Sequence, residues 1–80
     1  MNTRYSLSQL PPGTCGRIHS LSGAEAMVRR LEDLGLIEGT QVCCAFRAPS
    51  GDPAAYFFRG SLIAIRNTDA ERIFLEGAIL

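Results

Sequence analysis

The sequence predicts a mostly β domain, a small β-barrel of about five strands with one α-helix inserted after the first strand. Short runs rich in β-branched and aromatic residues recur along the chain, and Gly, Pro, Asn or Asp bounds each of them. Only residues 23–34 place apolar side chains at helical spacing. Eighty residues form one domain, 1–80, and five short strands with one helix bury their faces best when the sheet closes into a barrel.

The chain enters through a short segment in which Leu7 and Leu10 are expected to pack against the body of the domain. Residues 11–13, two prolines and a glycine, form a turn, because Pro fixes φ and Gly accepts a positive φ. Residues 14–21 follow as the first strand. Gly16 inside that strand indicates a bend or a close approach of another backbone segment.

The helix is expected to begin after Ser22, which has Glu25 three residues later, the spacing of a capping box. It is expected to end near residue 34, because Gly35 readily adopts the left-handed conformation that stops a helix. Its charged side chains lie on the side opposite an apolar stripe. The stripe consists of Ala24, Met27, Val28, Leu31 and Leu34.

The second strand, 40–48, has a period of two that places Val42, Cys44 and Phe46 on one face. The loop that follows, 49–53, contains two prolines, a glycine and an aspartate. We therefore expect a rigid, exposed connection to the next strand.

Three further strands are expected, and together they complete the barrel. Gly60 and Ser61 permit a tight hairpin between the first two of them, and residues 67–70 form a turn before the last. These strands span residues 54–59, 62–66 and 72–76, with Ile63, Ile65, Ile73 and Leu75 facing inward.

The charge balance excludes several classes of function. The eight cations, all Arg, are matched by eight acids, so the surplus of positive charge that non-specific nucleic-acid binding or electrostatic membrane attachment requires is missing. No apolar stretch approaches the ~20 residues that span a bilayer, and no signal peptide is visible. We therefore expect a cytoplasmic protein without nucleic-acid binding or direct membrane insertion, and a net charge near zero favours a homo-oligomer.

The three cysteines do not indicate a disulfide framework, a metal site or a nucleophile. Their number is odd, so reduced thiols in a reducing compartment are expected. Cys15 and His19 would stand about 13 Å apart on one strand, too far to share a metal ion. Cys43 and Cys44 would point to opposite faces. No metal ligand, cofactor site or catalytic residue is therefore predicted, and Cys44 is expected to be a buried apolar thiol.

The order and spacing of three motifs resemble the ferrous iron transport protein A (FeoA-like) family. They are Arg-Leu-Glu-Asp-Leu-Gly at 30–35, Gly-Asp-Pro at 51–53 and Ile-Ala-Ile-Arg at 63–66. The resemblance extends from Leu7 to about Glu76. It implies a small SH3-like β-barrel with a helical insertion and no enzymatic activity.

The resemblance also implies a partner. Members of this family act in the bacterial cytoplasm as accessory or regulatory proteins of ferrous iron uptake. They interact with the ferrous iron permease, the ferrous iron transport protein B, a membrane protein with a cytosolic GTP-binding domain. The alternative is an SH3-like regulatory or oligomerisation module related to the C-terminal domain of iron-dependent repressors. Such a module needs a DNA-binding partner chain, because this sequence has no helix-turn-helix.

The first candidate contact surface for a partner is the charged side of the helix, which carries Arg29, Arg30, Glu32 and Asp33. Arg30 falls within the family motif. The alternative is a solvated helix face held by intrahelical ion pairs, since Glu25–Arg29 and Arg29–Asp33 both have i,i+4 spacing.

The second candidate is the tip of the 49–53 loop, Ser50, Gly51 and Asp52. Residues there could contact a partner, or they could serve only as a rigid hairpin connection. Gly51 has a backbone reason to be glycine, and Asp52 can stabilise the loop through a hydrogen bond to the main chain.

The third candidate is an outward-facing apolar patch. If the isoleucines of the last strands face inward, Leu62, Phe74 and Phe57 face outward, together with the apolar residues 78–80. On a small monomer such a patch indicates a contact surface. The alternative is that the helix or the N-terminal segment covers it.

Overall fold

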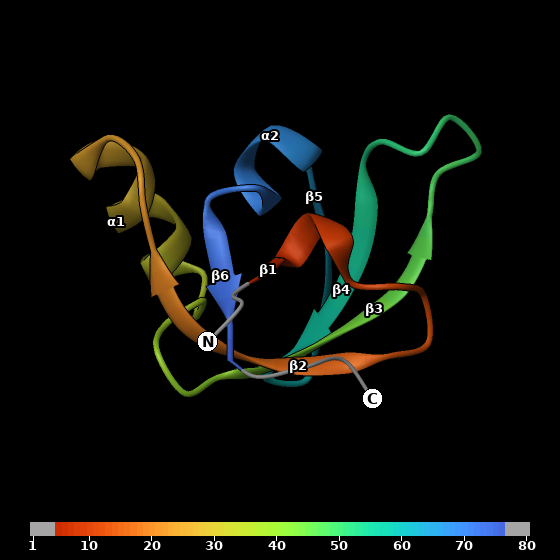
Figure 1. Cartoon of the computed structure of the whole chain (residues 1–80), viewed down its shortest axis with the longest axis horizontal. Coiled ribbons are helices and arrows are strands. Elements are labelled where there is room, and N and C mark those ends of the chain that lie inside the picture. Colours follow the sequence, from red (N-terminus) through yellow and green to blue (C-terminus); the bar gives the residue numbers. More distant parts are fainter. Residues whose placement is uncertain (1–4, 77–80) are drawn as a thin grey trace.

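A computed structural model describes residues 5–76 of the chain. The fold is mostly β and SH3-like, as predicted. Six strands form one antiparallel sheet in the order β1-β6-β2-β3-β4-β5, and one helix of nine residues packs beside it (Figure 1). The elements are β1 (Tyr5–Ser6), the 3₁₀ helix η1 (Leu7–Gln9), β2 (Cys15–Leu21), α1 (Glu25–Asp33), β3 (Gln41–Arg47), β4 (Ala54–Phe58), β5 (Ser61–Ile65), α2 (Asn67–Ala70) and β6 (Ile73–Leu75).

Strand β2 joins the two halves of the sheet. Its first half pairs with β3, and its second half pairs with β6 across a register shift between Ile18 and Ser20. In Figure 1 the strand runs along the base of the molecule and then turns upward beside α1. Gly16 permits this path, because a Cβ there would lie 2.9 Å from Cδ1 of the buried Leu75. The sequence predicted a bend or a close backbone approach at Gly16, whereas the close neighbour is the side chain of Leu75.

The expected closure of five strands into a complete barrel is wrong. The described sheet has six strands, with β1 and β5 at its edges. Strand β1 has only two residues, and η1 then carries the chain across the opening instead of along β5. The hydroxyl of Tyr56 donates to the carbonyl oxygen of Leu7 at 3.3 Å, so η1 is held over the interior by the inner face of β4.

The core fills the space between the curved sheet and η1. Leu7 and Leu10 are fully buried, which confirms that the entry segment packs on the body of the domain. Helix α1 contributes only Leu31 to the core, so most of its predicted apolar stripe is half-buried or exposed. The other large, fully buried side chains are Ile18, Leu36, Val42, Cys44, Tyr56, Phe58, Ile73 and Leu75.

The predicted capping box of the helix is wrong. Helix α1 begins at Glu25 with Ala24 at its N-cap, and no side chain caps it. Ser22 lies too early in the chain, because its N–H donates to the carbonyl oxygen of Arg72 at 2.9 Å and so extends the β2–β6 ladder. The predicted stop at Gly35 is confirmed by its φ of 109°.

The side chains of β3 do not keep one pattern of orientation along the whole strand. Val42 and Cys44 point into the core as predicted, but Phe46 is 56% exposed. The register between β3 and β4 shifts between Cys44 and Phe46. A bulge adds one residue to one strand only, so every side chain after it changes face. The bulge therefore sends Phe46 outward.

Candidate protein-docking surface

A row of four side chains crosses the outer face of the sheet. In the strand register, Cys15 of β2 lies opposite Cys43 of β3, Cys43 lies opposite Phe57 of β4, and Phe57 lies opposite Leu62 of β5. Phe57 is 49% exposed and Leu62 is 54% exposed. The outward orientation that the sequence predicted for these two residues is therefore confirmed.

A second row lies beside the first. Phe46 is opposite Ala55, and Ala55 is opposite Ala64. Because alternate residues of a strand share a face, Ala55 lies on the same side as Phe57, and Ala64 on the same side as Leu62. The two rows form one surface, which we call the outer apolar face. It comprises Cys43, Phe46, Phe57, Leu62 and Ala64, with Ala55, only 7% exposed, between Phe46 and Ala64.

The outer apolar face ends at β5, which is an edge strand of the sheet in the described part of the chain. Within residues 5–76, β5 pairs only with β4, so the main chain along its other side has no strand partner. Natural edge strands are usually protected by a charge, a proline or a bulge. Residues 61–65 read Ser-Leu-Ile-Ala-Ile and carry no charge or proline. A strand of this kind accepts an additional strand from a partner, because unpaired N–H and C=O groups provide the affinity.

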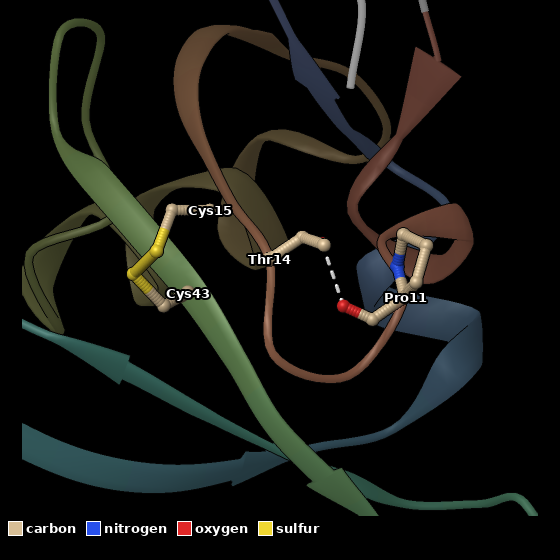
Figure 2. The surroundings of a disulfide bond; sticks show 4 residues. All are labelled: Pro11, Thr14, Cys15 and Cys43. Carbon is tan, nitrogen blue, oxygen red and sulfur yellow. Dashed lines mark hydrogen bonds between the residues drawn. A yellow bond between two sulfur atoms is a disulfide. The ribbon is translucent and has the colours of Figure 1, made fainter. Parts of the chain in front are cut away.

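The expectation of three reduced thiols is wrong. Cys15 and Cys43 form a disulfide that joins β2 to β3 (Figure 2). The sequence alone did not reveal the pair, because its members are 28 positions apart with the whole of α1 between them. Only the strand register places them opposite one another. Cys44 faces the core and is buried, as predicted, with a free thiol.

The charged residues predicted on the helix are exposed, and two of them are engaged in ion pairs. Arg29 contacts Glu25 at 3.5 Å within α1, and Arg30 contacts Asp69 of α2 at 3.3 Å. The pair expected between Arg29 and Asp33 is not formed. Glu32 and Asp33 are exposed at the end of the helix.

The loop between β3 and β4 is tied to α2. Asp52 Oδ1 accepts a hydrogen bond from the N–H of Asn67 at 3.0 Å, and Asn67 Nδ2 donates to the carbonyl oxygen of Gly51 at 3.3 Å. Ser50 Oγ donates to the carbonyl oxygen of Asp52 at 3.0 Å. Each of the three loop residues predicted as contacts thus has a structural role within the loop.

The structure does not bring the predicted contact residues into one site. Helix α1 and the β3–β4 loop stand at opposite ends of the molecule in Figure 1, with α2 between them. Phe74 is half-buried on β6, opposite Ser20 of β2, so three strands separate β6 from Leu62 on β5. The apolar residues 78–80 lie outside the described residues. Of the predicted patch, Leu62 and Phe57 remain together.

The inner face of the sheet carries a polar group at its rim. Arg47 Nη2 donates to the carbonyl oxygens of Ser8 and Leu10 at 2.7 and 2.9 Å. Burial raises the pKa of Tyr56, an effect that the nearby Arg47 guanidinium partly opposes, and burial likewise raises the pKa of Cys44. Both groups therefore stay protonated at neutral pH and serve the core.

Within residues 5–76, no three His, Cys, Asp or Glu side chains gather closely enough to hold a metal ion. His19 is half-buried on β2, and both Cys15 and Cys43 are consumed by the disulfide. In the same range, neither helix combines the length and the apolar composition that crossing a bilayer requires. The surface best suited to a function is therefore the outer apolar face.

Comparison with known proteins identifies relatives. The family model for the FeoA domain matches residues 5–77. FeoA from Chlorobium tepidum is 35% identical, with a TM-score of 0.82 over 89% of this chain and 68% of that one. A prokaryotic SH3 domain protein, the zinc-complexed FeoA of Stenotrophomonas maltophilia, is 28% identical, with a TM-score of 0.78 over 89% of this chain and 88% of that one.

A manganese-dependent transcriptional repressor shares the fold alone. It has a TM-score of 0.84 but only 13% identity, over 98% of this chain and 44% of the repressor. No match was found among curated proteins.

Proposed function

This chain belongs to the FeoA family, and from that premise we propose that it is a cytoplasmic, non-enzymatic accessory protein of bacterial ferrous iron uptake. Its partner in this proposal is the ferrous iron permease, bound through the permease's cytosolic GTP-binding domain. The observation that carries the proposal is the outer apolar face, because a large exposed apolar surface on a small domain is typical of a protein contact site.

The outer apolar face has the features of a docking site. Phe46, Phe57 and Leu62 are each about half exposed, so a partner that covers them removes further apolar area from water. The sheet beneath them is rigid, since Ala54, Tyr56 and Ile65 on its other side are buried in the core. The edge of β5, which has no strand partner among residues 5–76, adds main-chain donors and acceptors beside the apolar contacts.

Two other, separate regions are candidates for the same test. Arg29, Arg30, Glu32 and Asp33 of α1, and Ser50, Gly51 and Asp52 of the β3–β4 loop, remain candidate contacts for the permease. The ion pairs of Arg29 and Arg30 weigh against the helix as a contact surface. The hydrogen bonds of Ser50 and Asp52 weigh against the loop. Phe74 stays a minor candidate, because it is half-buried and distant in the sheet from Leu62.

Two leucines allow a matched experiment. Leu62 is 54% exposed on β5, and Leu34 is 45% exposed at the end of α1. Each is replaced by Ser, and binding to the purified GTP-binding domain of the permease is measured with and without GTP. We expect Leu62→Ser to weaken binding about tenfold, the usual scale for a central apolar contact, and Leu34→Ser to leave it unchanged.

The opposite pattern would move the docking site to the helix. Absence of binding by the unmodified protein in both nucleotide states, combined with normal ferrous uptake in a strain lacking it, would sink the proposal. Both leucines are largely outside the core, so each variant is expected to retain the stability of the parent within about 0.5 kcal/mol.

A further inference from the structure

The disulfide belongs to the row of side chains that crosses the outer face of the sheet. Cys43 is directly opposite Phe57, and Phe57 is directly opposite Leu62, so the sulfur pair continues the outer apolar face onto β2. Cys15 is exposed and lines an open surface depression together with Gly16, Arg17 and Gln41. A thiolate in solution therefore has access to the bond at Cys15.

The third cysteine does not compete for exchange. Cys44 is 1% exposed and points into the core, away from the disulfide. Burial also raises the pKa of its thiol, so the reactive thiolate form is suppressed. Exchange is therefore confined to Cys15 and Cys43.

Main-chain hydrogen bonds hold β2 and β3 together around the disulfide. Hydrogen bonds link the same two segments on both sides of the bridge. Gly13 N donates to Cys44 O at 2.8 Å, Cys44 N donates to Thr14 O at 2.9 Å, and Ile18 N donates to Thr40 O at 2.9 Å. Figure 2 shows the turn before Cys15 closed by the Thr14 hydroxyl, which donates to the carbonyl oxygen of Pro11 at 2.6 Å. Reduction therefore leaves β2 and β3 paired.

We propose that Cys15 and Cys43 form a reversible thiol–disulfide exchange site whose redox state controls docking through the outer apolar face. This inference rests on the proposed cytoplasmic accessory function. Disulfides are rare in the cytosol of mesophiles, and those that occur there are usually transient and catalytic or redox-sensing. The co-reactant is a cellular thiol of the glutathione or dithiol-protein class.

The exchange is balanced in two steps. A thiolate of the co-reactant attacks Sγ of Cys15, the bond to Cys43 breaks, and Cys43 leaves with the electron pair and takes a proton from water. A second co-reactant thiolate then attacks the co-reactant sulfur of the mixed disulfide and releases Cys15, which is protonated in turn. Two protein thiols form, and two co-reactant thiols become one disulfide.

The two states present different surfaces to a partner. The disulfide is an uncharged, fixed extension of the apolar row. The dithiol adds two ionisable groups, and a glutathione attached to Cys15 would place a bulky anion beside Phe57. We therefore expect the disulfide form to dock more tightly than the reduced or glutathione-bound form.

The chemical test uses the full chain in glutathione buffers of graded redox potential. Thiols are trapped with an alkylating reagent under native conditions and located by mass spectrometry. We expect Cys15 and Cys43 to become labelled together in one two-electron transition within the range of potentials that the glutathione buffers span. Cys44 should stay unlabelled until the protein is denatured. A pair that stays reduced in oxidised glutathione, or resists reduction without denaturant, overturns the exchange site.

The docking test compares the oxidised, reduced and glutathione-bound protein, with Cys44→Ala as the matched control that keeps the exchange pair. We expect reduction to weaken binding to the GTP-binding domain about tenfold in both the parent and Cys44→Ala. Equal binding in all redox states overturns the control of docking and leaves the proposed function standing. Absence of binding in every state overturns the proposed function, and the labelling result still decides the exchange site.

Discussion

Arg47 Nη2 donates to the carbonyl oxygen of Leu10 at 2.9 Å and thereby fastens the entry segment to the end of β3. The same nitrogen reaches the carbonyl oxygen of Ser8 at 2.7 Å. One side chain therefore satisfies two main-chain acceptors of the segment that covers the open side of the sheet.

Replacing Arg47 by Met should lower the free energy of unfolding by about 1.5–3 kcal/mol, because hydrogen bonds from a charged donor are lost and their carbonyl acceptors stay partly buried. Urea denaturation measures the change. Arg29→Met is the matched control, since the ion pair that Arg29 forms with Glu25 is exposed, and it should change stability by less than about 0.5 kcal/mol. Equal effects in the two variants would show that Arg47 does not hold the entry segment.

Gly16→Ala should destabilise the fold by about 1–3 kcal/mol, the usual cost of overpacking a core. The added methyl group would meet Cδ1 of Leu75 at 2.9 Å, and Leu75 is fully buried. Gly39→Ala is the control, because its Cβ would meet nothing within 4 Å although φ is 89°. Its backbone strain alone should cost about 1 kcal/mol. Adding Leu75→Val should relieve much of the Gly16→Ala penalty but none of the Gly39→Ala penalty.

Stability should fall on the alkaline side. Burial raises the pKa of Cys44, Tyr56 and Tyr5 above their ordinary values. A folded state with raised pKa values holds its protons longer than the unfolded chain, so alkali favours unfolding. The free energy of unfolding should not depend on pH near neutrality. It should begin to decline above about pH 8.5 because of the thiol, and decline further above about pH 10 because of the tyrosines. Tyr56→Phe should make the decline above about pH 10 shallower.

The same Tyr56→Phe variant tests the contact with η1. At neutral pH it should cost about 1 kcal/mol, because the carbonyl oxygen of Leu7 loses its buried donor. Denaturation at about pH 7 and about pH 10.5 separates the two effects. An alkaline decline identical to that of the parent would contradict the burial of the Tyr56 hydroxyl.

Asp52 distinguishes a structural loop from a recognition loop. Asp52→Ala should lower stability by about 1 kcal/mol, because the N–H of Asn67 loses its acceptor. Asp52→Asn keeps an oxygen acceptor and removes the charge, so it should retain most of the stability. Binding to the permease domain should be unchanged in Asp52→Asn. A tenfold loss of binding without loss of stability would instead make the loop a contact.

Local patterns in the sequence predicted most of the elements. The strands, the helix stop at Gly35 and the burial of Leu7 and Leu10 depend on period, turn residues and apolar content within a few residues. These signals are present in any short window of the chain. The outward orientation of Leu62 and Phe57 follows from the same two-residue period.

The features that the sequence did not predict depend on register between distant strands. A bulge after Cys44 has no residue signature here, and so the exposure of Phe46 was missed. Cys15 and Cys43 meet only because β2 and β3 align at that pair. Phe74 is less buried than its neighbours Ile73 and Leu75, as the two-residue period predicts. However, β6 lies between β1 and β2 in the sheet, which separates Phe74 from Leu62. Helix α1 and the β3–β4 loop carry two of the three family motifs, yet the fold places them at opposite ends of the domain.

Within residues 5–76, the edge of β5 that has no strand partner is also a site where copies of the protein could pair with one another. An apolar edge without a charge or proline is a template for any extended segment, including the same strand of another copy. A net charge of zero adds no long-range repulsion between copies. The five residues that would give affinity for a partner therefore also set the solubility of the chain. We therefore expect the isolated protein to self-associate at high concentration unless a partner covers this edge.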